Sequence, residues 1–113
     1  MKAGRELDTL VTEKIFGMEP SKGDGYHRKS RKDAWQIVPH YSTDIGAAWH
    51  VVEHMRANVP DYRALRMESV PLGYTVAFYS HKNRLDRIGA FVAAETAPLA
   101  ICLAALKAVG ALE

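Results

Sequence analysis

The sequence has a single cysteine and almost no net charge. Cys102 alone can form neither a disulfide within the chain nor a cysteine-based metal cluster. A formal net charge of +2 is too small to predict a nucleic-acid polymer as the partner. No apolar run approaches the roughly 20 residues of a membrane span, and the start MKAGRELDTLV lacks the apolar stretch of a secretory signal. These absences predict a protein of a reducing cytoplasm with no membrane partner.

The charge is unevenly distributed along the chain. Residues 22–33 contain five basic and two acidic side chains, a local charge of +3, so the remaining sequence sums to about −1. At 113 residues the chain is long enough for one hydrophobic core but not for two. We therefore expect a single domain over residues 1–113, with a basic loop at about 18–34.

Two segments in the first half have the apolar spacing of amphipathic helices. The first spans residues 4–16, and Gly17 is suited to end it. The second begins near Ser42 or Thr43, either of which can cap it, and ends before Pro60. The apolar stripe expected to face the core of this second helix is Ile45, Ala48, Trp49, Val52 and Met55.

The last segment, ETAPLAICLAALKAVGAL, is apolar around most of its circumference. Thr96 is expected to cap it, Pro98 lies in its first turn, and Lys107 is its only charge over three turns. A helix so apolar must be buried on more than one side. In so small a protein this predicts either a central position or contact with a partner subunit.

The remaining periodic segments predict strands. A short strand is expected at 35–38, before Pro39, and a hairpin at 62–70 and 73–80 is joined by Pro71-Leu72-Gly73. A last strand is expected at 88–93. The predicted fold class is α+β, with the order α-β-α-β-β-β-α.

The basic loop contains a near match to a nucleotide-binding motif. Residues 23–30 read G-D-G-Y-H-R-K-S, one residue from the phosphate-loop pattern G-x-x-x-x-G-K-[ST]. Arg28 stands where that pattern needs glycine, and a helix precedes the segment where a strand is required. The phosphate-loop interpretation therefore fails. Two interpretations remain open: a solvated basic segment, or an anion clamp in which Tyr26 stacks on a base.

No other pattern predicts catalysis. His50 and His54 share one helix face, but the order H-V-V-E-H is not that of a metalloprotease, and exposed polarity is the simpler interpretation. Cys102 lies in an apolar helix and is expected to be a buried small hydrophobe. We therefore expect no enzymatic activity, no metal and no cofactor.

Three blocks of the sequence resemble the phage ABA sandwich domain family. They are GRELDTLVTEKIFG, YSTDIGAAWHVVEHM and AETAPLAICLAALKAVG, about 46 of the 113 residues. The resemblance implies a small antiparallel sheet between helices, an α-β-α sandwich, in a phage or prophage protein of the bacterial host cytoplasm. The intervening segments vary within the family. One departure is Met18, where an aromatic residue is usual, which puts the class of ligand in doubt.

The family is similar to anti-Thoeris proteins, which sequester cyclic ADP-ribose-type and other cyclic nucleotide signals without cleaving them. Such proteins form dimers or hexamers with ligand pockets at subunit boundaries. The resemblance thus implies a small phosphorylated ligand and a homo-oligomer. The alternative is a phage accessory module that docks on an acidic protein and has no small-molecule ligand.

We expect two basic segments to supply the ligand contacts, the loop at 18–34 and the connection at 81–87. Loops between strands often hold binding residues, and arginine and lysine in such loops contact phosphates. The residues expected to bind phosphate are Arg28, Lys29, Arg31, Lys82 and Arg84. Those expected to contact a base or ribose are Tyr26, Tyr79 and Asn83.

Overall fold

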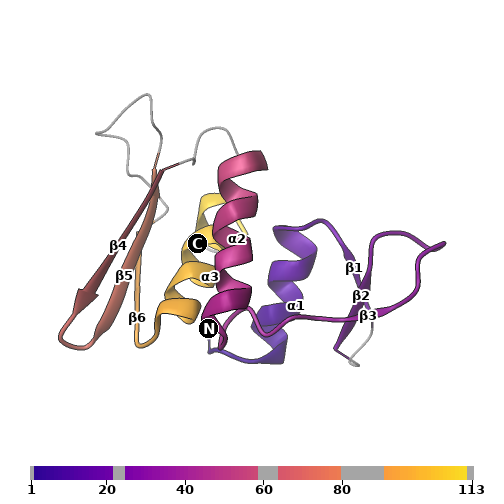
Figure 1. The fold of residues 1–113 in the computed structure, drawn as a ribbon, viewed down its shortest axis with the longest axis horizontal. Helices are drawn as coiled ribbons and strands as arrows, with labels where there is room; N and C mark the ends of the chain where they lie inside the picture. Colours follow the sequence, from indigo (N-terminus) through magenta and orange to yellow (C-terminus); the bar gives the residue numbers. More distant parts are fainter. Residues whose placement is uncertain (1, 22–24, 59–63, 80–90, 112–113) are drawn as a thin grey trace.

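Three helices lie together between two small antiparallel sheets (Figure 1). The structure is a computed structural model, and it describes residues 2–21, 25–58, 64–79 and 91–111. In chain order the elements are α1 (Arg5–Lys14), β1 (Glu19–Pro20), β2 (Tyr26–Arg28), β3 (Gln36–Ile37), α2 (Ile45–Asn58), β4 (Ala64–Val70), β5 (Gly73–Tyr79), β6 (Phe91–Ala94) and α3 (Ala97–Ala108). None of the described helices is long and apolar enough to cross a membrane.

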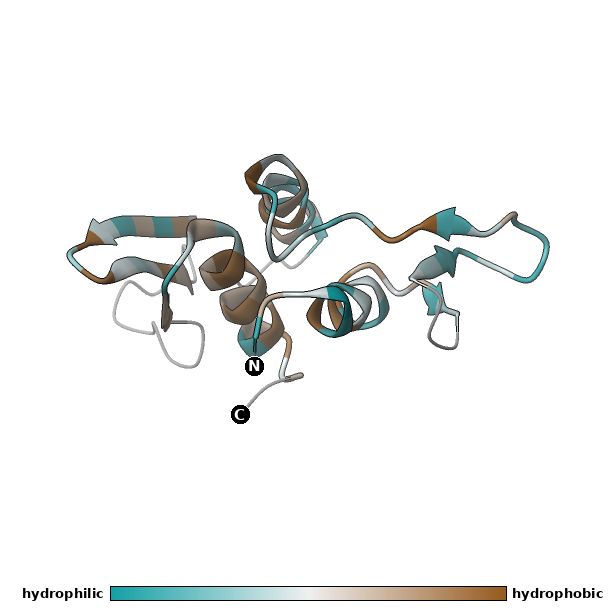
Figure 2. Ribbon diagram, turned by 90° about the horizontal axis from the view of Figure 1, so that it is seen from below, coloured by the Kyte–Doolittle hydropathy of each residue, from teal (hydrophilic) through white to brown (hydrophobic). Residues whose placement is uncertain are grey.

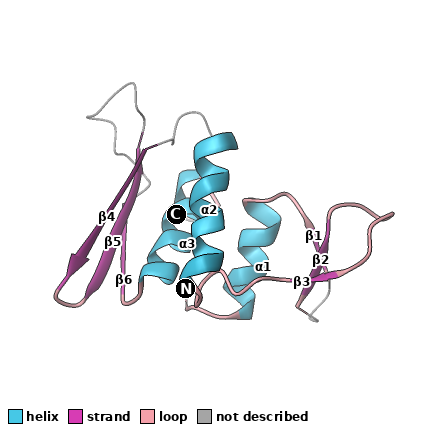
Figure 3. Cartoon of the chain, in the orientation of Figure 1, coloured by secondary structure: helices cyan, strands magenta, loops and turns pink. Residues whose placement is uncertain are grey.

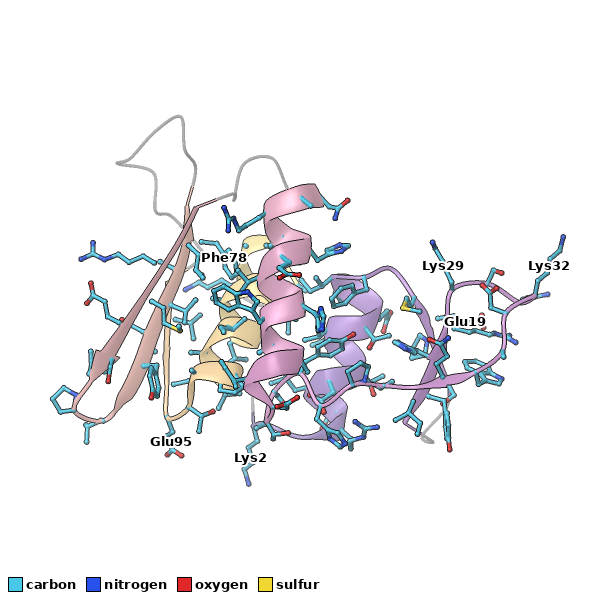
Figure 4. The ribbon with its side chains drawn as sticks, in the orientation of Figure 1. Lys2, Glu19, Lys29, Lys32, Phe78 and Glu95 are labelled. Carbon is cyan, nitrogen blue, oxygen red and sulfur yellow. The ribbon has the colours of Figure 1, made fainter. Side chains whose placement is uncertain are left out.

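The larger sheet has the order β4-β5-β6, with antiparallel pairing throughout. A tight turn at Pro71 and Leu72 joins β4 to β5, so that Val70 pairs with Gly73. On β5, Val76 and Phe78 are fully buried in the core that the sheet shares with the helices. Figure 4 shows Phe78 between the sheet and the helices.

Helix α3 occupies the centre of the molecule and packs against α1, α2, β5 and β6. Its buried residues are Ala100, Ile101, Cys102, Ala104, Ala105 and Leu106. Thr96 caps it as predicted, because its Oγ1 accepts a hydrogen bond from the Leu99 N–H at 3.4 Å. Of the two explanations that its apolar composition allowed, the central position is the one observed. Burial within a single chain therefore accounts for this helix.

The buried face of α2 is rotated from the predicted stripe. Ala47, Ala48, Val51, Val52 and Met55 are buried, whereas the predicted core residues Ile45 and Trp49 are exposed. The buried face thus includes two alanines, and the larger side chains of Ile45 and Trp49 lie outside it. The stripe was therefore wrong at two positions.

The cap of α2 also differs from the prediction. The Asp44 carboxylate accepts a hydrogen bond from the Ala47 N–H at 3.3 Å, and the Asp44 carbonyl accepts the first helical bond from Ala48. Ser42 is instead fully buried and bonded to α1. Asp44 thus has the capping role that was predicted for Ser42 or Thr43.

The predicted fold class and element order are confirmed. The hairpin and the last strand also lie where they were expected, although residues 62–63, 80 and 88–90 fall outside the described residues. The loop expected over 18–34 was wrong, because it contains β1 and β2, which join β3 in a second antiparallel sheet. β3 confirms the short strand expected at 35–38, whereas β1 and β2, of two and three residues, are too short to produce a detectable period.

Candidate ligand-binding arm

The second sheet projects from the helices on the side opposite to β4–β6. We call its described residues, 19–21 and 25–37, the arm. Figure 2 shows the arm extending outward from α1, while the larger sheet lies beyond the helices at the other end. The whole molecule is accordingly elongated, with principal extents of 43 × 30 × 24 Å.

Strand register determines which side chains share a face of the arm. Arg28 pairs with Glu19, and Tyr26 pairs with Ile37. Because side chains alternate along a strand, these four lie on one face and His27 lies on the other. Trp35, two residues before Ile37, joins the first face, which we call the outer face.

Arg28 is held in place by two neighbours on the outer face. Its Nε donates to Glu19 Oε2 at 3.0 Å, and its guanidinium lies over the Trp35 ring, 4.1 Å from the ring centroid. The hydrogen bond from Arg28 lowers the pKa of the Glu19 carboxyl. Part of the charge of Arg28, a predicted phosphate ligand, is therefore already balanced within the arm.

Three large side chains of the outer face remain open to solvent. Tyr26 is 41% exposed, Trp35 is 43% exposed and Ile37 is 64% exposed. Tyr26 is among the residues that the sequence predicted to contact a ligand, whereas Trp35 and Ile37 are not. The signal that could have found them is the alternation Tyr26-x-Arg28 and Trp35-x-Ile37 on either side of a polar turn, which is typical of a hairpin.

That polar turn carries the exposed positive charge. The Asp33 N–H donates to the Ser30 carbonyl at 3.1 Å, and the Ser30 hydroxyl donates to Asp33 Oδ2 at 3.1 Å. Lys29, Arg31 and Lys32 are exposed around this turn. In Figure 4, Lys29 and Lys32 point outward from the end of the arm. The arm thus combines aromatic side chains on one face with cations at its tip.

Arg5 of α1 connects the arm to the helices. Its guanidinium donates to the Val38 carbonyl at 2.8 Å and to the Gly25 carbonyl at 3.3 Å. The Val38 carbonyl follows β3 and the Gly25 carbonyl precedes β2. One side chain therefore binds both chain ends of the β2–β3 hairpin. The geometry of the arm is therefore fixed by α1.

A buried polar cluster supports the same junction. Asp8 is fully buried, and its Oδ1 accepts hydrogen bonds from the Ser42 N–H at 2.8 Å and the Ser42 hydroxyl at 2.7 Å. Ser42 Oγ in turn accepts from the Gly4 N–H at 2.8 Å. Buried hydrogen bonds to a carboxylate are among the stronger ones in proteins. This cluster fastens the segment between β3 and α2 to the start of α1.

The comparisons with known proteins agree with this architecture. A family model described as the phage ABA sandwich domain matches residues 9–106. The chain belongs to the phage ABA sandwich domain family. The 2.0 Å crystal structure of a phage protein from Bacillus cereus ATCC 14579 is similar, with 32% identity and a TM-score of 0.72 over 95% of this chain and 91% of that one. A search of curated proteins found no match.

This ABA sandwich protein places Tyr79, another predicted ligand residue, on an element apart from the arm. Tyr79 ends β5, in the sheet on the opposite side of the helices, and its side chain lies outside the described part of the structure. Lys82, Asn83 and Arg84 also fall outside the described residues. Tyr26, Arg28, Lys29 and Arg31 are the predicted contacts that the structure brings together.

The structure of this ABA sandwich protein shows the surroundings of Cys102 and of the histidine pair His50 and His54. Cys102 is fully buried as predicted, and burial raises the pKa of its thiol to about 12, with a smaller contribution from Asp8. His50 is exposed, whereas His54 lies against Phe16 with 4.6 Å between ring centroids. Among the described residues no three His, Cys, Asp or Glu side chains are grouped to hold a metal ion.

Proposed function

We propose that this ABA sandwich protein is a non-catalytic phage protein that binds a small phosphorylated nucleotide and sequesters it in the cytoplasm of the bacterial host. The ligand would be a cyclic nucleotide or a cyclic ADP-ribose-type signal, and the protein would act as a homo-oligomer. The observation that carries the proposal is the arm, with Tyr26 and Trp35 exposed beside a basic turn.

The chemistry of the arm suits both parts of a nucleotide. Stacking of a base on an aromatic side chain contributes about 1–3 kcal/mol, and a charge-assisted contact to phosphate contributes about 1.5–3 kcal/mol. No ion pair within the described part of the chain holds the side chains of Lys29, Arg31 and Lys32, so they are available to a phosphate. One stacked base and three such contacts would support micromolar binding before ordering costs.

The position of the arm supports the oligomeric part of the proposal. A projecting sheet contacts a ligand from one side, whereas small-molecule sites bury most of the ligand surface. A second copy of the chain would supply the other wall. The oligomer is therefore argued from the open outer face of the arm and not from the apolar composition of α3, which burial within the chain explains.

Calorimetric titration with cyclic dinucleotides, cyclic trinucleotides and cyclic ADP-ribose isomers tests the proposal. We expect binding to at least one of them, with recovery of the ligand unchanged by mass spectrometry after long incubation. Absence of heat with every ligand, for folded protein of measured oligomeric state, would overturn the proposal, and recovery of a cleaved product would overturn its non-catalytic part.

Paired variants locate the site. The double variant K29Q/R31Q removes two charges from the arm and should weaken binding by about tenfold or more for each cation that pairs with a phosphate. The control K2Q/K14Q removes the same charge from positions outside the arm and should leave the affinity unchanged. An equal weakening in both would assign the effect to net charge and contradict a site on the arm.

A second candidate is a protein–protein module that uses the arm to dock on an acidic phage or host protein. Ile37 favours it, because this exposed aliphatic side chain contributes to a protein interface but is not needed by a phosphate. Capture of a partner from infected cells by the wild type but not by Ile37→Asp, together with no nucleotide binding, would select this function.

A further inference from the structure

Strand β4 is the longest free sheet edge in the described structure. It pairs with β5 along Ala64–Val70, and no other described strand pairs with its second side. Figures 1 and 3 show β4 at the outer margin of the molecule. The strand β6, at the other edge of the same sheet, has four residues against seven in β4. An exposed edge of this length presents unpaired N–H and C=O groups to another strand.

The side chains of β4 do little to protect this edge. Proteins commonly protect an edge with proline, charged side chains or a covering helix; β4 contains no proline or lysine, and its two charged side chains, Arg66 and Glu68, are paired with each other. Arg66, Met67, Glu68 and Ser69 are all exposed. Met67 lies opposite the fully buried Val76, on the face that packs on the helices, yet it remains 40% exposed. An apolar side chain on the core face is thus open along the free edge.

The charges of β4 are arranged symmetrically about Met67. Arg66 and Glu68 lie opposite Ala77 and Thr75, on the other face of the sheet, and Arg66 Nε donates to Glu68 Oε1 at 2.7 Å. Two opposite charges placed one residue before and one residue after a central position are complementary to themselves. An antiparallel copy of the strand, rotated about that centre, brings each charge against its opposite.

We propose that β4 pairs antiparallel with β4 of a second copy of this chain, with Met67 opposite Met67 of the partner subunit. Arg66 then lies opposite Glu68 of the partner subunit, and the reverse pair forms across the two-fold axis. The two three-stranded sheets become one sheet of six strands, with the backbone groups of both edges paired.

The same charges select this register over its neighbours. A shift of the pairing by two residues places Arg66 opposite Arg66 of the partner subunit or Glu68 opposite Glu68 of the partner subunit, and like charges directly opposite are unfavourable. A shift by one residue places the two Met67 side chains, and with them the two helix-packing faces, on opposite sides of the joined sheet. The register centred on Met67 is the one that satisfies both the charges and the apolar face.

This interface rests on the proposed homo-oligomer, but it does not supply the second wall of the ligand site at the arm and is independent of ligand binding. The arm lies beyond the helices from β4, so β4 pairing leaves both arms accessible. If the chain forms an oligomer through another surface, the present inference fails and the proposed function stands. If the chain is a monomer that still binds nucleotides, the inference and the oligomeric part fail, and the ligand-binding part stands.

Charge exchange at β4 provides the first test, with molar mass measured by sedimentation equilibrium over a concentration series. Arg66→Glu and Glu68→Arg should each weaken dimerisation by about tenfold or more, because each turns two attractive pairs into repulsive ones. The double variant R66E/E68R should restore it, since the opposite charges face each other again. A mixture of the two single variants should form heterodimers, which shows that each variant remains folded.

Cross-linking provides the second test. Directly opposite residues of antiparallel strands have Cα atoms about 4.5–5.5 Å apart, within the range that a disulfide spans. Met67→Cys should therefore give a covalent dimer under mild oxidation, without interference from the buried Cys102. Leu72→Cys, at the exposed hairpin turn, is the control and should cross-link far less. A wild type that is monomeric at tens of micromolar, an oligomer insensitive to both charge reversals, or equal cross-linking of the two cysteine variants would overturn the interface.

Discussion

Two adjacent side chains on β2 have opposite surroundings at the residue scale. Arg28 lies on the outer face of the arm with Glu19 and Trp35, whereas His27 is buried on the other face and its Nδ1 has no hydrogen-bond partner among the described residues. Burial lowers the pKa of His27, because the protonated ring loses its hydration there. A neutral imidazole is therefore part of the folded arm.

The buried His27 predicts a loss of stability in mild acid. Above about pH 6.5, the pKa of an unfolded histidine, the ring is neutral in both states and contributes nothing to the pH dependence. Below that pH the unfolded chain binds a proton that the folded chain resists, so the free energy of unfolding falls as the pH falls toward the lower folded pKa. Urea unfolding of the wild type between pH 7.5 and pH 5 should show this fall.

A matched pair of variants assigns that fall to His27. His27→Gln should flatten the slope of unfolding free energy against pH, whereas His50→Gln, an exposed histidine on α2, should leave it unchanged. The slope is compared and not the absolute stability, because removal of a buried ring has its own cost. The lowered pKa of the Glu19 carboxyl acts at lower pH, since it lies below the usual value of 4.5. An unchanged slope in His27→Gln would contradict the assignment.

At the scale of elements, a helix or strand was easiest to predict where its pattern of apolar residues extends over many residues. The helices α1 and α2 and the β4–β5 hairpin were predicted because each carries a repeat over seven residues or more, and α3 was predicted from its long apolar run, its cap and Pro98. The arm strands β1 and β2 were missed because two or three residues show no repeat, whereas β3 lies within the strand expected at 35–38. On α2, Ile45 and Trp49 were assigned to the core because they are apolar and share a helical spacing with Ala48, but the face that is buried includes Ala47 and Val51 instead.

The candidate site was predictable only in part for a related reason. The basic turn and Tyr26 are visible as residue types, so the sequence alone identified them. Trp35 and Ile37 become part of the same surface through strand register, which places them beside Arg28 and Tyr26. Such proximity is a property of pairing between strands and is absent from the local sequence.

The β4–β5 hairpin depends on glycine at one position. Gly73 has φ +148°, and a Cβ there would lie 2.2 Å from the carbonyl oxygen of Ala94 on β6. Gly73→Ala should therefore lower the free energy of unfolding by about 2–4 kcal/mol, through backbone strain and displacement of β6. Chemical denaturation followed by circular dichroism measures the change.

The control for that substitution is Gly46→Ala on α2. A Cβ at Gly46 would meet the Asp44 carboxylate at 3.6 Å, an ordinary contact, and alanine is favoured over glycine in a helix. Gly46→Ala should be neutral or stabilise the protein by up to about 1 kcal/mol. Similar destabilisation by both substitutions would show that the close approach of β5 to β6 does not limit position 73.

At the scale of the whole molecule, stability and the candidate site occupy different regions. The fully buried core is made by the three helices, β5 and the segment after β3, and α3 lies at its centre. The outer face of the arm contributes none of its large side chains to that core. Substitutions can therefore remove one property and leave the other intact.

This separation predicts opposite outcomes for two isoleucines. Ile37→Ser, on the exposed outer face, should change the free energy of unfolding by less than about 0.5 kcal/mol, yet it should alter ligand or partner binding at the arm. Ile101→Ala, fully buried in α3, should lower the free energy of unfolding by about 2–5 kcal/mol through the cavity it leaves. Under conditions where this variant is still folded, its binding affinity should match the wild type. Denaturation and calorimetric titration of both variants measure the four quantities. If Ile37→Ser destabilises the protein as much as Ile101→Ala does, the arm belongs to the core and cannot serve as a separate binding surface.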